Sequence, residues 1–181
     1  MTRSTTEAGN TVIPWQEQQT WLEVTDSVRH ILVRREGELA GLCTTAGELL
    51  RGIEALSAPI DSLCRQTCAC CSDICCRRAT VWYDSVDILI LALAKRPLPR
   101  AQIRKVRDSR GRSACHHLGG QGCDLPRSER PFICTWYICP AQTHLLRDTD
   151  PGAVQQLLND LSGLKKQRKS LEEAFIRITV I

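Results

Sequence analysis

The cysteines of this 181-residue chain are concentrated in one short segment, which constrains the possible folds more than any other feature. Six of the eleven cysteines fall within thirteen residues, and these six are Cys64, Cys68, Cys70, Cys71, Cys75 and Cys76. A second group follows downstream and consists of Cys115, Cys123, Cys134 and Cys139. Thiols this close together suit two chemistries, disulfide bridging or thiolate binding of a soft metal such as zinc or iron.

Other features of the chain favour a metal over disulfides. The first ten residues contain no apolar signal region, and the longest apolar run, at residues 88–94, is far too short to span a bilayer. We therefore expect a cytoplasmic protein with no membrane partner, in a compartment that keeps thiols reduced. An odd number of cysteines also fits complete pairing poorly. Metal binding is the favoured interpretation, and disulfide or redox-active thiol chemistry is the alternative.

The chain before the cysteines has the pattern of a helical arm. Apolar residues recur there at spacings of three and four, which is the helical period. They are Trp21, Val24, Val28, Ile31, Leu39, Leu42, Ala46, Leu49, Ile53 and Leu56. Arg35 interrupts this stripe, and Gly37 and Gly41 favour a break or bend nearby. We predict a helical arm over residues 15–57, as one long helix or two helices in line, that ends before Pro59.

A second long helix is predicted at the end of the chain, over residues 150–178. Asp150 can cap it, and Pro151 fits its first turn, where a missing N–H costs nothing. Its apolar residues repeat at heptad spacing and are Val154, Leu157, Leu161, Leu164, Leu171 and Phe175. Arg168 is the one polar residue within this stripe. Because both arms have a stripe to bury, we predict that they pack as an antiparallel pair. A homodimeric coiled coil is the competing interpretation.

Residues 58–145 lie between the arms and are predicted to form a cysteine module rich in loops. One short strand is predicted at residues 79–83, because it is rich in β-branched and aromatic residues. A helix over residues 85–95 follows, with Asp84 as its cap and Asp87 completing a partial capping box. The module is predicted to be held together by metal rather than by a large core.

The predicted fold is therefore mainly α-helical, with the N- and C-terminal helices packed around a metal-binding cysteine module with one short strand. We expect a single domain over residues 15–181, which is long enough to bury a hydrophobic core. Residues 1–14 are polar and are predicted to form a flexible tail. Residues 108–140 are rich in Gly, Pro, Arg and Cys and are predicted to be loop.

The spacing of the cysteines indicates specific ligand pairs. Zinc commonly binds thiolates two to four residues apart, because that turn lets both sulfurs face one ion. Cys68 and Cys71 have this spacing, and so do Cys64 and Cys68. Cys75 and Cys76 are adjacent, so their side chains diverge. Such a pair is easier to understand in a polynuclear site or between two ions.

The order of the cysteines resembles that of the YkgJ-type cysteine-cluster family, whose members are described as zinc- or iron-chelating domains. The resemblance covers roughly residues 64–140 and rests on Cys68-x2-Cys71-x3-Cys75-Cys76, Cys115-His-His-Leu and Cys123-x6-Arg130-Pro131-x2-Cys134. It implies a ligand set of Cys68, Cys71, Cys75, Cys76, Cys115, Cys123 and Cys134, with Cys139 as an eighth. The chain departs from the family signature, CxxCxxCC, by one additional residue before Cys75 and by the added Cys64 and Cys70. Either added cysteine could replace one of these ligands.

We therefore expect a thiolate-based metal-binding protein that holds zinc, iron or an iron–sulfur cluster in a redox, maturation or metal-handling role. One alternative is a structural zinc module whose helical arms bind a protein partner or form a homodimer. Another is a metal-dependent enzyme, because the cysteine pattern also resembles a flagellin lysine methylase family. The spacing Cys64-x3-Cys68-x2-Cys71 is also that of radical S-adenosylmethionine enzymes, but the chain has too few predicted strands for their barrel. We find no paired carboxylates placed for acid–base catalysis, so a hydrolase is disfavoured.

Several other residues have simpler interpretations. Cys43 lies on the apolar stripe and is predicted to be a buried structural thiol. His116 and His117 are predicted to support the ligands or to be solvated, rather than to bind the metal. Arg130 could bind an anionic substrate, or it could equally donate hydrogen bonds to thiolates or loop carbonyls. The basic stretch at residues 95–112 lacks interleaved aromatic residues and a recognition helix, so we interpret it as solvated and expect no nucleic-acid partner.

Overall fold

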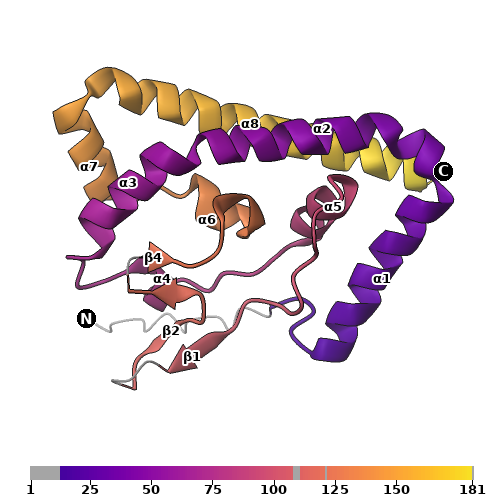
Figure 1. Ribbon diagram of the computed structural model, residues 1–181, viewed down its shortest axis with the longest axis horizontal. Helices are drawn as coiled ribbons and strands as arrows, with labels where there is room; N and C mark the ends of the chain where they lie inside the picture. The colour runs from indigo at the N-terminus through magenta and orange to yellow at the C-terminus, as the bar shows by residue number, and fades with distance from the viewer. Residues whose placement is uncertain (1–12, 108–110, 121, 181) are drawn as a thin grey trace, which may run out of the picture.

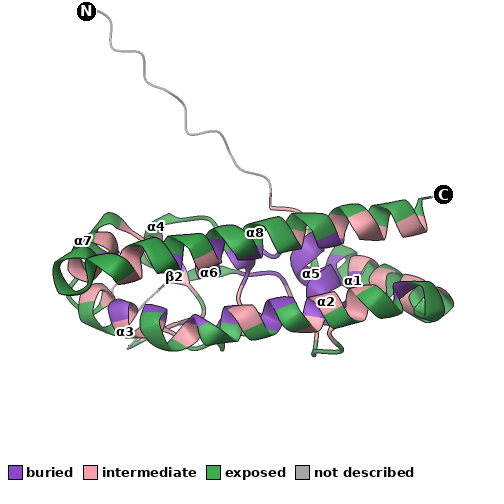
Figure 2. Cartoon of the chain, turned by 90° about the horizontal axis from the view of Figure 1, so that it is seen from above, coloured by how far each residue is buried: buried purple, intermediate pink, exposed green. Residues whose placement is uncertain are grey.

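Two long helices run side by side along the molecule. The computed structural model describes residues 13–107, 111–120 and 122–180. Helix α2 (Glu36–Ala55) and helix α8 (Pro151–Thr179) lie antiparallel and in contact (Figures 1 and 2), so the predicted mainly helical fold and its pairing of the two arms are confirmed. No helix among the described residues is both long and apolar enough to cross a membrane.

The apolar residues that recur along α2 and α8 are buried in one core, which also contains residues of α5. Those that are buried are Leu39, Ala46, Leu49, Leu50 and Ile53 from α2, and Leu157, Leu161, Leu164 and Leu171 from α8. Full burial of each aliphatic side chain larger than alanine contributes about 1.5–3 kcal/mol to folding. The helices approach closely at Gly52, where a Cβ atom would lie 2.8 Å from Cδ2 of Leu164. A larger residue at position 52 therefore requires Leu164 to move.

Helix α1 (Gln18–Arg34) turns sharply away from α2 at Arg35 (Figure 1). Neither alternative predicted for this arm, one long helix or two helices in line, is therefore correct, although the expected break lies at Arg35. Arg35 leaves the helical conformation, with φ −120° and ψ 28°. Its guanidinium donates hydrogen bonds to the carbonyl of Ile178 near the end of α8 and to the carboxylate of Glu38. These contacts hold the bend between α1 and α2 in place. Helix α1 then packs on α5 (Ser85–Leu93) instead of on α8.

Helix α5 is almost fully buried and begins with the predicted capping box. The carboxylate of Asp84 accepts hydrogen bonds from two backbone N–H groups of the first turn. Asp87 completes the box by accepting a hydrogen bond from the N–H of Asp84. The helix ends at Leu93, two residues before the predicted end, because Lys95 adopts a left-handed conformation with φ 55°.

The prediction of a strand at residues 79–83 is wrong, since no strand of the described chain pairs with this segment. Instead, the side chain of Gln102 takes the place of a neighbouring strand. The N–H of Tyr83 donates to Oε1 of Gln102 at 2.7 Å, and Nε2 of Gln102 donates to the carbonyl of Tyr83 at 3.0 Å. The aromatic and β-branched residues of the segment are explained by packing, because the ring of Tyr83 lies 6.0 Å from that of Trp21 and Val81 packs against the same cluster.

The strands lie further along the chain, in two short antiparallel hairpins. They are β1 (Lys105–Arg107) with β2 (Ser113–Cys115), and β3 (Leu118–Gly119) with β4 (Gly122–Cys123). Cys115 and Cys123 therefore stand at the ends of hairpin strands. Residues 108–110 and 121 lie outside the described residues.

The cysteine module contains more helix than predicted. Its helical elements are α3 (Ser57–Cys68), α4 (Cys75–Arg78), the 3-10 helix η1 (Arg127–Glu129), α6 (Phe132–Trp136) and α7 (Pro140–Thr149). Helix α2 does end before Pro59, as predicted, but α3 begins only two residues later. Pro59 lies in the first turn of α3, where a proline is tolerated. The prediction that residues 108–140 are only loop is therefore wrong.

The predicted tail, residues 1–14, lies mostly outside the described residues. Its last residue is held in place, because the carbonyl of Pro14 accepts a hydrogen bond of 3.1 Å from Nε2 of Gln102. The next residue, Trp15, packs against the cluster that contains Trp21. The folded part of the chain therefore begins at or before Pro14.

Candidate metal centre

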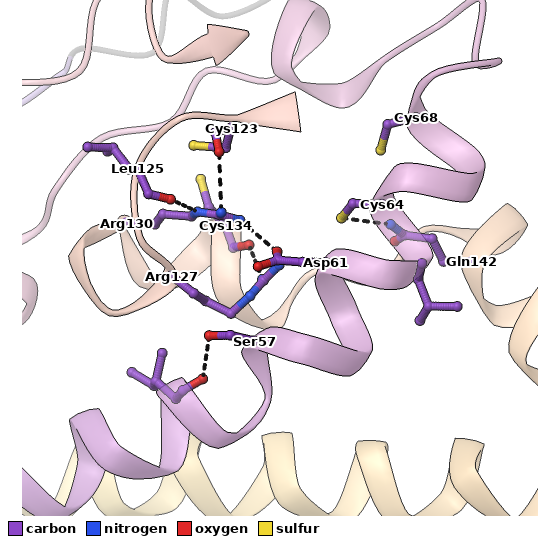
Figure 3. A network of polar contacts seen from close by, with 12 residues as sticks. Ser57, Asp61, Cys64, Cys68, Cys123, Leu125, Arg127, Arg130, Cys134 and Gln142 are labelled. Carbon is purple, nitrogen blue, oxygen red and sulfur yellow. Dashed lines mark hydrogen bonds and ion pairs between the residues drawn. The ribbon is translucent and has the colours of Figure 1, made fainter. Parts of the chain in front are cut away.

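The first two thiols of the centre lie on a helix. Cys64 and Cys68 are four residues apart in α3, so their side chains leave the helix on one face. Figure 3 shows their sulfurs on adjacent turns. Burial raises the pKa of Cys68 to about 11, and the nearby charges of Cys64 and Cys75 add to this rise. Cys68 therefore lies within electrostatic reach of a thiol of its own helix and of one in α4.

Cys75 and Cys76 form the first turn of α4 and interact with each other. The adjacent thiol of Cys76 is the main cause that lowers the pKa of Cys75 to about 6. Backbone N–H groups at the start of the helix lower it further. The adjacent sulfur of Cys75 raises the pKa of Cys76 in turn, as do burial and the charges of Cys134 and Cys115. The pair is therefore poised to hold one negative charge.

Cys115 is brought to α4 by the first hairpin. Its cross-strand partner is Lys105, whose Nζ donates hydrogen bonds of 3.2 and 3.0 Å to the carbonyls of Arg77 and Arg78 at the end of α4. Burial and the charge of Cys123 raise the pKa of Cys115. One lysine thus joins the strand pair that carries Cys115 to the helix that carries the adjacent cysteines.

Cys123 and Cys134 complete the cluster from β4 and α6. Their sulfurs are drawn close to each other in Figure 3. Burial raises the pKa of Cys134 to about 12, and the charges of Cys123, Cys115 and Cys75 raise it as well. Cys134 therefore lies within electrostatic reach of thiols from three other segments.

Two arginines and one aspartate tie these segments to α3 (Figure 3). The carboxylate of Asp61 pairs with Arg127, whose side chain is 1% exposed, and with Arg130 at 3.4 Å. Arg127 also donates to the carbonyl of Cys134 at 3.4 Å, and Arg130 donates to the carbonyl of Cys123 at 3.5 Å. Of the two alternatives left open for Arg130, the described contacts are those of a donor to loop carbonyls.

The structure brings six of the eight predicted ligands into one electrostatic neighbourhood. These six are Cys68, Cys75, Cys76, Cys115, Cys123 and Cys134. Cys71 is exposed, and its backbone N–H donates a hydrogen bond to the carbonyl of Cys68. Cys139 precedes α7, and its N–H donates to the side chain of Gln142 at 3.0 Å. Cys64, which the family pattern does not include, lies beside Cys68, whereas Cys70 is exposed.

The described thiols do not form a ready-made coordination sphere. No three His, Cys, Asp or Glu side chains within the described ranges are arranged so that they could hold a metal ion as they stand. The donor set nevertheless fits zinc or iron by its chemistry, because it consists of soft ligands from several segments. All eleven cysteines are free. The segments would have to draw closer around a metal.

The two histidines next to Cys115 interact with each other and with the backbone. The ring centroids of His116 and His117 are 3.8 Å apart. Nδ1 of His116 lies 3.0 Å from the carbonyl oxygen of Arg104, just before β1. Burial lowers the pKa of His117, and the charge of His116 lowers it further. The imidazole of His116 is therefore oriented by the hairpin backbone.

Sequence reasoning missed the polar residues that organise the module, namely Asp61, Arg127 and Gln142. Arg127 lies between the ligand candidates Cys123 and Cys134, which was a possible signal. Its partner Asp61 is 66 residues earlier, and no local pattern connects the two. Searches of protein-family profiles, of curated proteins and of solved structures found no match to this chain.

Proposed function

We propose that this protein binds a metal through cysteine thiolates, as zinc, iron or an iron–sulfur cluster, in a redox, maturation or metal-handling role. The observation that carries this proposal is the convergence of thiols from α3, α4, β2, β4 and α6. Burial and mutual repulsion oppose ionisation of Cys76, Cys115 and Cys134, so their proximity is unfavourable once they are charged. A bound cation removes this cost, because metal binding and thiol deprotonation are coupled.

We assign the first coordination sphere to Cys76, Cys115, Cys123 and Cys134, because the charges of these thiols act on one another. Cys75 and Cys68 lie next to them and would serve a second ion or a cluster, which explains the adjacent pair in α4. When bound, zinc would join the segments, whereas iron would add electron transfer. Arg127 and Arg130 hold the backbone carbonyls of two of these ligands and so orient their segments.

The test is elemental analysis and an absorption spectrum of protein purified without oxygen. Iron with acid-labile sulfide and a broad visible band would indicate a cluster, and stoichiometric zinc without colour would indicate a zinc site. Cys134→Ser is expected to lose most of the metal, because it removes a half-buried thiol that lies within electrostatic reach of three other thiols. Cys70→Ser is the matched control, since Cys70 is exposed, and it should retain the metal. A wild-type protein without metal, or equal loss in both variants, would contradict the proposal.

A structural zinc module is the second candidate, favoured by the scarcity of core in the hairpin region. Between residues 104 and 126, Ala114 is the one described residue that is buried. A metal could supply the stability that burial does not supply there. We expect a chelator to make this region sensitive to proteolysis while α2 and α8 stay protected. If chelation removes the metal without changing the cleavage pattern, the metal has another role than structural support.

A further inference from the structure

Helix α3 presents two thiols together on one rigid element. Cys64 and Cys68 stand at positions i and i+4, and both are half-buried. Residues with this spacing can bind one metal ion from a single helix face, as the two histidines of an H-E-x-x-H helix do. The next two cysteines of the chain, Cys70 and Cys71, are exposed after the end of the helix.

The sulfur of Cys64 has a fixed hydrogen-bond donor, the side chain of Gln142. The backbone N–H of Cys139 donates to Oε1 of Gln142 at 3.0 Å, and a backbone N–H can only donate. The amide oxygen must therefore face Cys139, which leaves Nε2 facing Cys64 at 3.3 Å from its sulfur (Figure 3). Gln142 is only 4% exposed, so water does not compete for this amide.

An N–H group directed at a sulfur favours a thiolate or a metal-bound sulfur as its acceptor. Such hydrogen bonds orient ligands and tune metal centres. Cys139 is the N-cap of α7, where its side chain and that of Gln142 form a capping box. Its sulfur thus belongs to the helix cap, whereas the sulfur of Cys64 faces the side-chain amide of Gln142.

We propose that Cys64 is a ligand of the metal centre and clamps the metal together with Cys68, in a position that the family pattern gives to Cys71 or Cys139. This inference rests on the proposed function. Gln142 acts in it as a positioning residue that holds the sulfur of Cys64. Helix α3 then carries a ligand pair, and α7 orients it.

The test is a titration of the reduced, metal-free, full-length protein with Co²⁺, whose thiolate bonds absorb in the near ultraviolet in proportion to their number. Cys64→Ser is expected to lower this absorption and to weaken Co²⁺ binding at least about tenfold. Cys71→Ser and Cys139→Ser should match the wild type in both. Gln142→Glu keeps an acceptor for Cys139 but places a carboxylate oxygen near the sulfur, so it should keep the absorption and weaken affinity by about 10–100-fold.

The outcomes separate this inference from the proposed function. If Cys64→Ser binds Co²⁺ like the wild type while Cys134→Ser does not, Cys64 is not a ligand and the proposed function stands. If the wild type itself shows no thiolate absorption, the proposed function fails. Circular dichroism of each metal-free variant checks the fold, and Cys64→Ala replaces Cys64→Ser if the serine variant does not fold.

Discussion

Arg168, the one charged residue within the apolar stripe of α8, reaches the buried carboxylate of Asp87 in α5. Its Nη2 donates to Oδ1 of Asp87 at 2.9 Å and also pairs with the half-exposed Asp84. Asp87 accepts two further hydrogen bonds, from the backbone N–H groups of Asp84 and Phe132. One arginine therefore links the C-terminal helix, the start of the central helix and the start of α6.

Arg168→Met should destabilise the protein strongly, because it leaves the carboxylate of Asp87 buried without a cation. Breaking a buried ion pair by removing one partner costs about 3–5 kcal/mol, and methionine preserves most of the side-chain volume. Urea unfolding at pH 7 measures the loss. The control is Lys169→Met, which removes an exposed pair with Glu173 and should cost less than about 1 kcal/mol. Equal losses of unfolding free energy in the two variants would show that the pair of Arg168 with Asp87 stabilises the protein no more than an exposed pair does.

Stability should also depend on pH through Asp87. Burial, and then the charge of Asp84, raises its pKa from 3.8 to about 6. The folded state therefore holds this proton in a range where the unfolded chain has released it. The contribution of Asp87 is fully present below about pH 4 and is lost as the pH rises through about 6.

Asp87→Asn isolates this effect, because an amide does not titrate. We expect the free energy of unfolding of the wild type, minus that of the variant, to fall between pH 4 and pH 7 by at most about 3 kcal/mol. Urea unfolding of both proteins at each pH measures it. A difference that stays constant or grows over this range would mean that the pKa of Asp87 is not raised.

Arg168 also shows why part of this fold could be predicted from the sequence and part could not. Helical period and the capping residues Asp84 and Asp150 are local signals, and the helices that they predict are present. The partner of Arg168, Asp87, lies 81 residues away. The sequence pattern of α8 therefore showed a charged residue among apolar ones, but not which residue it pairs with. The same applies to Gln102, whose side chain occupies the place of a strand beside Tyr83.

The candidate site follows the same division between local and distant signals. Cysteine spacing located the cluster, because ligands for one ion are close in sequence or in adjacent turns. It could not show that Cys64 and Cys68 lie on a helix, since Pro59 fits the start of a helix as well as its end. Nor could it show that Asp61 and Gln142, from two different helices, hold the cluster.

Gly52→Ala should weaken the packing of α2 on α8. The added Cβ would lie 2.8 Å from a buried methyl group of Leu164, and overpacking a core costs about 1–3 kcal/mol. Gly41→Ala is the control, because nothing lies within 4 Å of its Cβ, and it should gain up to about 1 kcal/mol from helix propensity. Thermal unfolding compares the two. Should Gly52→Ala be as stable as Gly41→Ala, the helices do not approach as closely as described.

Asp61→Ala should release the cysteine segments from α3. It removes the carboxylate that pairs with Arg127, whose side chain is buried, and with Arg130. Because Asp61 is one-third exposed, water can compensate in part, and we expect a loss of about 2–3 kcal/mol. Asp73→Ala breaks a fully surface-exposed pair with Arg78 in the same module and should cost less than about 1 kcal/mol.

The same two variants separate support of the metal centre from general stability. Arg127 and Arg130 hold the carbonyls of Cys134 and Cys123, so losing Asp61 should weaken binding of added Zn²⁺ by about tenfold or more. A competition assay with a chromogenic zinc chelator measures this at a temperature where both variants are folded. Asp73→Ala should bind Zn²⁺ like the wild type. If Asp61→Ala also does so, the network stabilises the fold without positioning the thiols.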